Sequence, residues 1–278
     1  MDAFMGDTSR IEYDSARHSL TIAAEFRELL RYRDFLRVLI AKTIKSRYKR
    51  SVLGVAWTLL NPLVNMAVLA IAFTAVFRTS IPNYPVYVLI GITVWNFFSQ
   101  TTTYAMGQFL WGGGLMKRVY VPPSVFAVAA IGNGLVNVAF SVIPLVLIML
   151  FTRHTIYPTW WFFPFAFLLL SVFALGVSLF MSALVVFFAD VFDMYQLLLQ
   201  AWFFLTPIIY PTEMFPAKHA WILELNPMHH FVELVRAPLF TGHLPDLRTC
   251  ALAASWALAS LVLGAWTFTR KADEFAYR

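Results

Sequence analysis

The chain has 278 residues, of which 60% are hydrophobic and only 13% are charged, and its net charge is +6. Soluble domains carry about 25% charged residues, and a soluble fold of this length could not bury so much apolar surface, so the composition excludes an ordinary soluble domain. Most basic residues lie in the N-terminal tail, where a membrane surface is a simpler partner than nucleic acid. The single cysteine, Cys250, excludes an internal disulfide.

The N-terminal segment 1–24 is polar and lacks the apolar core of a signal peptide, so we expect a flexible cytoplasmic tail. From 25 to 50 the pattern predicts an amphipathic helix in the headgroup plane of the membrane, with nine basic residues against three acidic ones. An ordinary anchoring helix would explain this segment equally well. Its apolar stripe, which Arg33 interrupts, consists of Phe26, Leu29, Leu30, Leu36, Ile40 and Ile44.

The stretch from Lys45 to Pro62 marks the point where the chain enters the membrane. Four basic residues in six positions are followed by an uncharged apolar run that lasts until Arg78. Lys and Arg cost about 2.5–3.5 kcal/mol each at the centre of a bilayer, but they are favoured beside anionic headgroups on the cytoplasmic face. This boundary therefore predicts both the start of the first span and its orientation.

The rest of the chain predicts an all-α membrane protein with six transmembrane helices, placed at 51–270, and a short cytoplasmic tail at 271–278. Each span needs about 20 apolar residues to cross a core of about 30 Å. The second span is unusually polar, with Asn96, Ser99, Gln100 and three consecutive threonines. The spans are expected near 53–77, 86–107, 124–151, 160–188, 194–210 and 249–269.

The distribution of positive charge supports this topology. The proposed inside segments hold eleven Lys/Arg in the N-terminal region, two at 117–118 and three at the C-terminus, whereas the outside segments hold five. An excess of Lys and Arg on cytoplasmic loops sets the orientation of membrane proteins. We therefore expect a multi-pass protein of the cytoplasmic (inner) membrane with both termini in the cytoplasm.

Two connections differ from ordinary loops. The cytoplasmic connection 108–123 combines three consecutive glycines, a basic pair and a proline pair, which favour a break between helices. The outer connection 211–247 is too apolar for a loop, and prolines cut it into two short helical pieces near 216–225 and 228–237. Broken helices at membrane depth are tolerated only when protein buries them or they line a cavity. The second connection therefore predicts a re-entrant helical segment on the outer face.

The chemistry that the sequence lacks narrows its function. A nucleotide-binding Gly-Lys-Ser/Thr loop is absent. Ionisable residues avoid the span centres, where ion-coupled carriers usually place one. His229 and His230 are adjacent on a predicted helix, so their rings diverge and make poor metal ligands. A passive channel or an externally driven transporter remains, and we expect no catalytic residue and no cofactor in this chain.

Aromatic residues make up 17% of the chain, and their role is open from sequence alone. They could anchor the span ends and face lipid, or they could line a path with rings that stack on the C–H faces of sugars. The residues in question are Trp95, Phe97, Phe98, Trp111, Trp202, Phe203 and Phe204.

Three motifs carry a resemblance to a known family over roughly residues 26–270. They are RYKRSVLGVAWTLLNPL at 47–63, LMKRVYVPP at 115–123, and TPIIYP at 206–211 followed by LNP at 225–227. In this order they resemble the membrane subunit of ABC-2 type exporters, in the polysaccharide branch that exports O-antigen, capsule or teichoic-acid polymers. The resemblance implies a permease for a polyprenyl-pyrophosphate-linked polysaccharide.

The family also implies partners and roles. Two copies of the chain would form a homodimer above two copies of an ATPase subunit, which would bind ATP and Mg. Arg47, Lys49 and Arg50 would lie at the substrate entrance near the pyrophosphate, for which Arg offers a bidentate fork; positive-inside anchoring explains the same residues about equally well. Coupling to the ATPase would involve Met116, Lys117 and Arg118. The outer gate would comprise Trp221, Glu224, Met228, Phe231, Glu233 and Arg236, of which Glu233 and Arg236 are spaced to pair on a helix.

Two alternatives remain open. An ABC-2 exporter of a drug or small lipid would share the same scaffold. A membrane-embedded assembly or glycan-handling protein without an ATPase would place polar residues at one membrane depth. Asn133 and Asn137 are the candidates for such a site, although helix packing explains them more simply.

Overall fold

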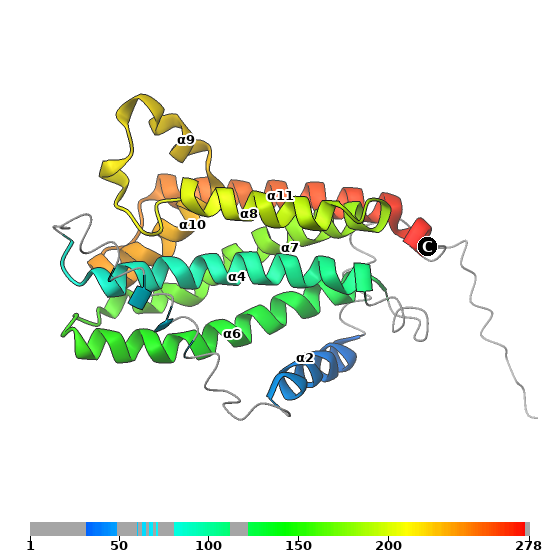
Figure 1. Cartoon of the computed structure of the whole chain (residues 1–278), viewed down its shortest axis with the longest axis horizontal. Coiled ribbons are helices and arrows are strands. Elements are labelled where there is room, and N and C mark those ends of the chain that lie inside the picture. The colour runs from blue at the N-terminus through cyan, green and yellow to red at the C-terminus, as the bar shows by residue number, and fades with distance from the viewer. Residues whose placement is uncertain are drawn as a thin grey trace, which may run out of the picture.

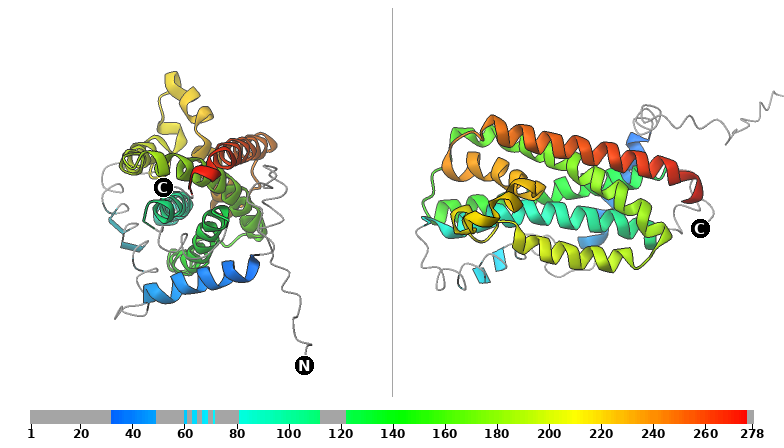
Figure 2. Two further views of the ribbon diagram at one scale, coloured as in Figure 1. Left: turned by 90° about the vertical axis from the view of Figure 1, so that its right-hand side faces the viewer. Right: turned by 90° about the horizontal axis from the view of Figure 1, so that it is seen from above.

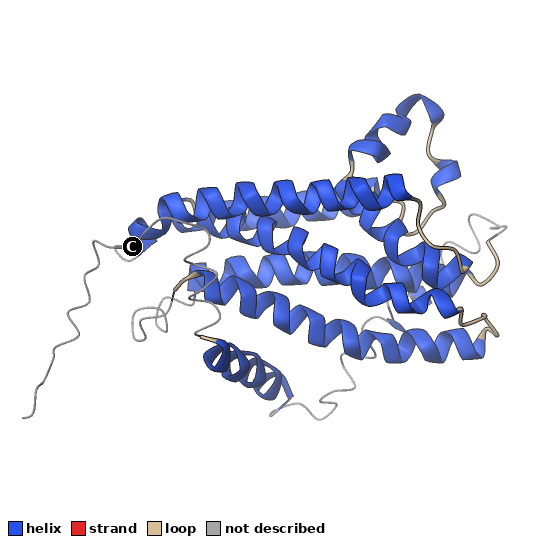
Figure 3. Cartoon of the chain, turned by 180° about the vertical axis from the view of Figure 1, so that it is seen from behind, coloured by secondary structure: helices blue, strands red, loops and turns tan. Residues whose placement is uncertain are grey.

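The computed structural model describes residues 32–48, 81–111 and 122–275, together with isolated positions between 60 and 71. Every regular element in this part of the chain is a helix (Figure 3). Most of the predicted first span lies outside the described residues, as does the N-terminal tail. The same holds for Lys49 and Arg50 and for the coupling residues Met116, Lys117 and Arg118. Arg47 lies in the last turn of a helix, α2, in which side chains are described only as far as Lys42.

Five helices run side by side along the long axis of the molecule (Figure 1). They are α4 (Tyr84–Trp111), α6 (Ser124–Phe151), α7 (Phe163–Phe187, after the 3-10 turn η2, Pro158–Phe162), α8 (Val191–Leu205) and α11 (Leu247–Phe275). Within the described residues, three segments are long and apolar enough to cross a membrane, namely Ser124–Phe151, Pro158–Phe187 and Leu247–Lys271. α4 is as long as α6 but more polar, and α8 has 15 residues, which gives a length of about 22 Å.

Several helices end at positions other than those that the sequence predicts. The sixth span was expected over 249–269, but α11 runs from Leu247 to Phe275 and includes the first residues of the predicted tail at 271–278. The fifth span was expected over 194–210, but α8 ends at Leu205 and the chain continues in an extended conformation through Thr206. Pro207 explains this end, because the residue before a proline is disfavoured in helical geometry. The second predicted span, 86–107, is longer at both ends in α4, so the connection predicted at 108–123 begins with the last turn of a helix.

α4 is the central helix of the bundle (Figure 2). It contacts α6, α7, α8 and the shorter helix α10 (Pro227–Arg236). The ring of Phe98 stacks on Phe173 with centroids 5.3 Å apart and meets Trp202 edge-on at 5.4 Å. Trp95 also packs against Trp202, at 6.1 Å. These rings, which the sequence left between lipid anchoring and pore lining, lie in the protein core instead.

α7 and α11 pack most closely, because glycines lie at their contact. The position of a Cβ on Gly264 is already occupied by the backbone of Gly176, and that of a Cβ on Gly176 by the backbone of Ser260. The Ser260 hydroxyl donates to the Phe173 carbonyl oxygen across the same contact, at 3.3 Å. Small residues at membrane helix interfaces allow this close backbone approach, and van der Waals contact then stabilises the pair.

α2 (Arg33–Tyr48) lies across the bundle axis against α6, as the left view of Figure 2 shows. Its apolar Leu36 and Ile40 are partly buried, whereas Arg33 is exposed. Ile40 packs on Gly132 of α6, at a position where a Cβ would collide with it. The amphipathic stripe that the sequence predicts therefore packs on protein over at least this turn of α2.

The close packing of α7 on α11 can be tested at Gly264. Replacing Gly264 by Val should lower thermal stability, because added side chains in a packed interior cost about 1–3 kcal/mol and here the obstacle is backbone. Thermal unfolding of the purified protein in detergent measures the effect. Ala259→Val on the same helix is the control, because Ala259 is exposed. Equal melting temperatures for the two variants would contradict the packing.

Candidate functional site

A broken segment follows α8 and re-enters the bundle. The chain leaves α8 through a bent, non-helical piece at 206–210, projects sideways, and returns as α10 (Figure 1). The elements are η3 (Thr212–Met214), η4 (Ala217–His219), α9 (Ala220–Leu225), α10 and the π-helical turn η5 (Ala237–Thr241). The sequence prediction of two short helical pieces agrees with α9 and α10 in number, while both helices differ from it by a few residues at their ends.

This bent piece has four consecutive backbone carbonyls, at 207–210, that accept hydrogen bonds from side chains. Arg236 donates to the carbonyl oxygens of Pro207 and Ile208, at 2.9 and 3.1 Å. The Tyr84 hydroxyl donates to the next carbonyl, that of Ile209, at 2.6 Å, and the Tyr87 hydroxyl donates to that of Tyr210, at 3.2 Å. Irregular backbone inside a membrane protein needs such internal partners. We call this set of bonds the carbonyl clamp.

Arg236 is the centre of the clamp. Its side chain is 4% exposed, and Nη1 also donates to the Tyr87 hydroxyl at 2.8 Å while the guanidinium lies 3.7 Å from the centroid of the Tyr87 ring. Gly91 provides the space, because a Cβ there would lie 2.9 Å from Nη2. The predicted pairing with Glu233 is wrong: within the described residues the Arg236 guanidinium bonds to carbonyls and a hydroxyl, and its charge faces a ring.

Asn226 forms a second link between α8 and α10. Its Oδ1 accepts from the backbone N–H of Met228, which caps α10, and from the indole N–H of Trp202, at 3.1 and 2.7 Å. Its Nδ2 donates to the Thr206 hydroxyl at 3.0 Å. One side chain therefore joins the end of α8 to the start of α10, as N-cap asparagines do for single helices.

The predicted gate residues fall into two groups. Met228, Phe231 and Arg236 are buried within the bundle, and Glu233 is partly buried beside them. Trp221 is 59% exposed on α9, and Glu224 forms an exposed ion pair with Arg248 at 2.8 Å. The structure therefore brings together the α10 residues but leaves the α9 residues on the surface.

The start of α11 lies next to this exposed ion pair. Asp246 precedes the helix, and hydrogen bonds from the side chain and the backbone N–H of Thr249 lower the pKa of its carboxyl. An aspartate before the first turn of a helix satisfies N–H groups that lack a partner and interacts favourably with the helix dipole. This cap fixes where the chain turns from the re-entrant segment into α11.

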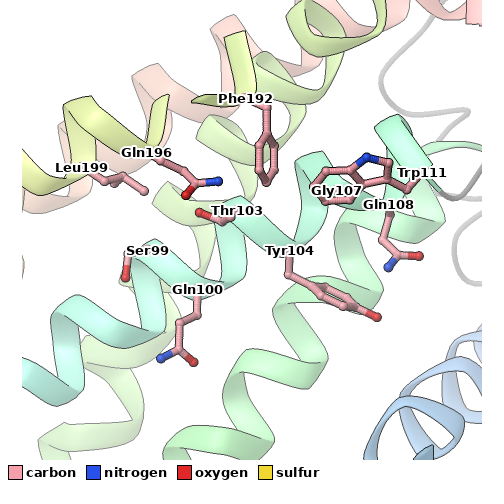
Figure 4. A pocket seen from close by; sticks show the side chains of 10 residues that line it. All are labelled: Ser99, Gln100, Thr103, Tyr104, Gly107, Gln108, Trp111, Phe192, Gln196 and Leu199. Atoms are coloured by element: carbon pink, nitrogen blue, oxygen red, sulfur yellow. The ribbon is translucent and has the colours of Figure 1, made fainter. Parts of the chain in front are cut away.

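A groove of about 700 Å³ lies between α4 and α8 (Figure 4). This volume is in the range of small-molecule sites. The groove is lined by three glutamines, a serine, a threonine, three aromatic residues, a glycine and a leucine. The residues are Ser99, Gln100, Thr103, Tyr104, Gly107, Gln108 and Trp111 on α4, and Phe192, Gln196 and Leu199 on α8.

Two aromatic rings close one end of the groove. Trp111 and Phe192 meet edge-on with centroids 4.7 Å apart, joining the end of α4 to the start of α8. Gly107 permits this arrangement, because a Cβ there would lie 3.0 Å from the Trp111 ring. Trp111 is nevertheless 70% exposed, so it presents a ring face or edge to whatever occupies the groove.

The polar residues of the second predicted span divide between groove and core. Ser99, Gln100 and Thr103 line the groove, whereas Thr102 turns inward and accepts a hydrogen bond from the Tyr195 hydroxyl at 2.8 Å. The sequence showed that this span is polar, but it did not show which polar residues line the groove and which lie in the core. Positions 100, 103, 104, 107, 108 and 111 have the spacing of one helix face, which was the available signal.

The contribution of the carbonyl clamp to stability can be tested at Arg236. Arg236→Gln should destabilise the protein by about 1–3 kcal/mol for each buried carbonyl that loses its donor. Arg248→Gln is the matched control, because exposed ion pairs contribute only about 0–1 kcal/mol. Thermal unfolding in detergent, compared with protein level in the membrane, measures both. A loss in Arg236→Gln no larger than in the control would contradict the clamp.

Comparisons with known proteins identify the family. Residues 35–240 match the family described as "ABC-2 type transporter". The chain is 32% identical over 254 residues to an "O-antigen export system permease protein RfbA" of Myxococcus xanthus, covering 90% of this chain and 97% of that protein. A protein with the same description from Klebsiella pneumoniae is 32% identical, with 76% and 82% covered. The "Polysialic acid transport protein KpsM" of Escherichia coli is 22% identical, with 81% and 89% covered. The chain belongs to the ABC-2 type transporter family, as an all-helical membrane permease.

Proposed function

We propose that this chain is the permease subunit that exports a polyprenyl-pyrophosphate-linked polysaccharide, O-antigen or a related envelope glycan, across the cytoplasmic membrane. ATP hydrolysis on a separate subunit drives the transport, and ATP and Mg bind there. Two copies of the permease and two copies of the ATPase make up the transporter. The protein itself catalyses no reaction.

The main structural support for this proposal is the groove between α4 and α8. Amides and hydroxyls, such as those of Gln100, Thr103 and Gln196, hydrogen-bond sugar hydroxyls, and the Trp111 and Phe192 rings can contact the apolar faces of sugars. Relatives that are similar along most of their length are named as O-antigen export permeases. A groove of hydrogen-bonding groups suits a hydroxyl-rich polymer better than it suits an apolar drug or lipid.

The arrangement of the chain supports a topology with both termini in the cytoplasm. α2 packs near the end of the bundle where α4 ends, α6 begins and α11 ends (Figures 1 and 2). Three groups of basic residues therefore belong to segments that connect to this end of the bundle. They are the residues after α2, the pair within 112–121 and the residues at the C-terminus. α10 and the clamp lie at the other end. Under the positive-inside rule the first end is cytoplasmic.

The roles of three regions follow from this orientation. Arg47, Lys49 and Arg50 meet the pyrophosphate at the cytoplasmic entrance, where α2 lies across the bundle. Met116, Lys117 and Arg118, between α4 and α6, receive the motion of the ATPase. α10, held by the carbonyl clamp, closes the outer exit.

The first test of the function is depletion of the protein from its host. A polyprenyl-linked glycan should accumulate on the cytoplasmic side and disappear from the cell surface, as measured by extraction and quantification of lipid-linked glycan. Expression of the wild-type chain during depletion is the control. If no lipid-linked glycan accumulates, the polysaccharide assignment fails and small lipids or drugs become the substrates to examine.

Coupling is tested by reversing charge in the connection between α4 and α6. The double variant Lys117→Glu, Arg118→Glu should insert normally but lose export, because it repels the surface that the basic pair contacts. Surface glycan and recovery of the ATPase subunit with the purified permease are the measurements. The conservative variant Lys117→Arg should retain export. Normal export by the double variant would rule out the coupling role.

A further inference from the structure

The groove contains no ionisable acid or base other than a tyrosine among the residues that line it in the described part of the chain. Its polar groups are the amides of Gln100, Gln108 and Gln196 and three hydroxyls. Amides and hydroxyls donate and accept hydrogen bonds without bearing a charge. The groove can therefore satisfy a neutral hydroxyl or acetamido group, whereas the ten described residues that line it offer a carboxylate no cation.

A charged polymer would be disfavoured in the groove, because the described lining residues include no cation. Taking a carboxylate or phosphate out of water costs several kcal/mol unless a cation or several donors compensate for it. Sites for such anions are usually built with Arg or Lys, often in bidentate geometry. Two basic residues at the end of α11 do not line the groove and lie against aromatic rings instead. The Arg270 guanidinium lies 4.1 Å from the centroid of the Trp266 ring, and the Lys271 ammonium lies 3.8 Å from the centroid of the Phe187 ring.

Charge near the closed end of the groove acts in the same direction. Asp190 and Asp193 flank the start of α8 beside Phe192, and both are exposed. Under the proposed orientation they lie on the cytoplasmic side, where the polymer arrives. These two carboxylates disfavour a polyanion at this end of the groove and leave a neutral polymer unaffected, whereas the basic residues assigned to the pyrophosphate belong to the segment around the end of α2.

We propose that the groove accepts an uncharged polysaccharide, whose repeating units bear hydroxyl or acetamido groups and no carboxylate or phosphate. This inference rests on the proposed export function and specifies its substrate class. The pyrophosphate of the lipid carrier is then the single anionic group of the substrate, and it is met outside the groove. The family itself does not decide the matter, because the named relatives include permeases for O-antigen and for polysialic acid.

The composition of the accumulated glycan tests the proposal separately from the function. After depletion, the lipid-linked polymer is hydrolysed and its sugars, uronic and sialic acids and phosphate are quantified. A neutral repeating unit is expected. An acidic repeating unit would overturn the inference while leaving export intact, whereas the absence of any accumulated polymer would overturn the export function on which it rests.

A pair of variants tests the groove itself. Gln196→Glu and Gln196→Lys introduce opposite charges at one lining position, and a neutral polymer should lose surface export to a similar extent in both. A polyanion would instead be exported at least as well by the Lys variant and more than about tenfold less by the Glu variant, because like charges repel at close range. Such an asymmetry would overturn the proposal.

The same two substitutions at Gln200 provide the control. Gln200 is exposed on α8 and does not line the groove. Its variants measure what a charge of either sign on α8 does to insertion and export, and this effect is subtracted from that at Gln196. Permease levels in the membrane are measured for all four variants.

Discussion

The fold depends on satisfying the backbone between α8 and the re-entrant segment. Four carbonyls in a row, at 207–210, cannot be bonded within a helix, and the bundle leaves them away from bulk water. Arg236, Tyr84 and Tyr87 supply every donor for them. Gly91 is required for the same reason, because any side chain there would displace the guanidinium. The position of α10 is thus fixed by hydrogen bonding as well as by apolar packing.

α8 is held at both of its ends. Its C-terminal end is joined to α10 through Asn226, Trp202 and Thr206, whereas its exposed residues, among them Gln196, face away from the bundle core or into the groove. The groove therefore has one wall in the central helix α4 and the other in a shorter helix, whose start is joined to α4 by the Trp111–Phe192 ring contact and by the hydrogen bond from Tyr195 to Thr102.

The sequence predicted the helical class, the long apolar helices and the existence of a re-entrant segment, because apolar length and proline spacing act locally. It could not place the end of α8, where a single proline outweighs an apolar run that continues to 210. It also missed the partners of Arg236, since Tyr84 and Tyr87 are about 150 positions away in the chain and only the fold brings them together. The aromatic residues were uncertain for the same reason: Phe98 is recognised as a core residue only through Phe173 and Trp202.

The carbonyl clamp also constrains the order in which the protein can be made. The carbonyls at 207–210 are synthesised well before Arg236, which supplies two of their donors. Until α10 emerges, this piece of backbone has no complete set of partners in the bundle and is stable only in contact with water. The segment after α8 therefore reaches its final depth together with α10, which brings the missing donors.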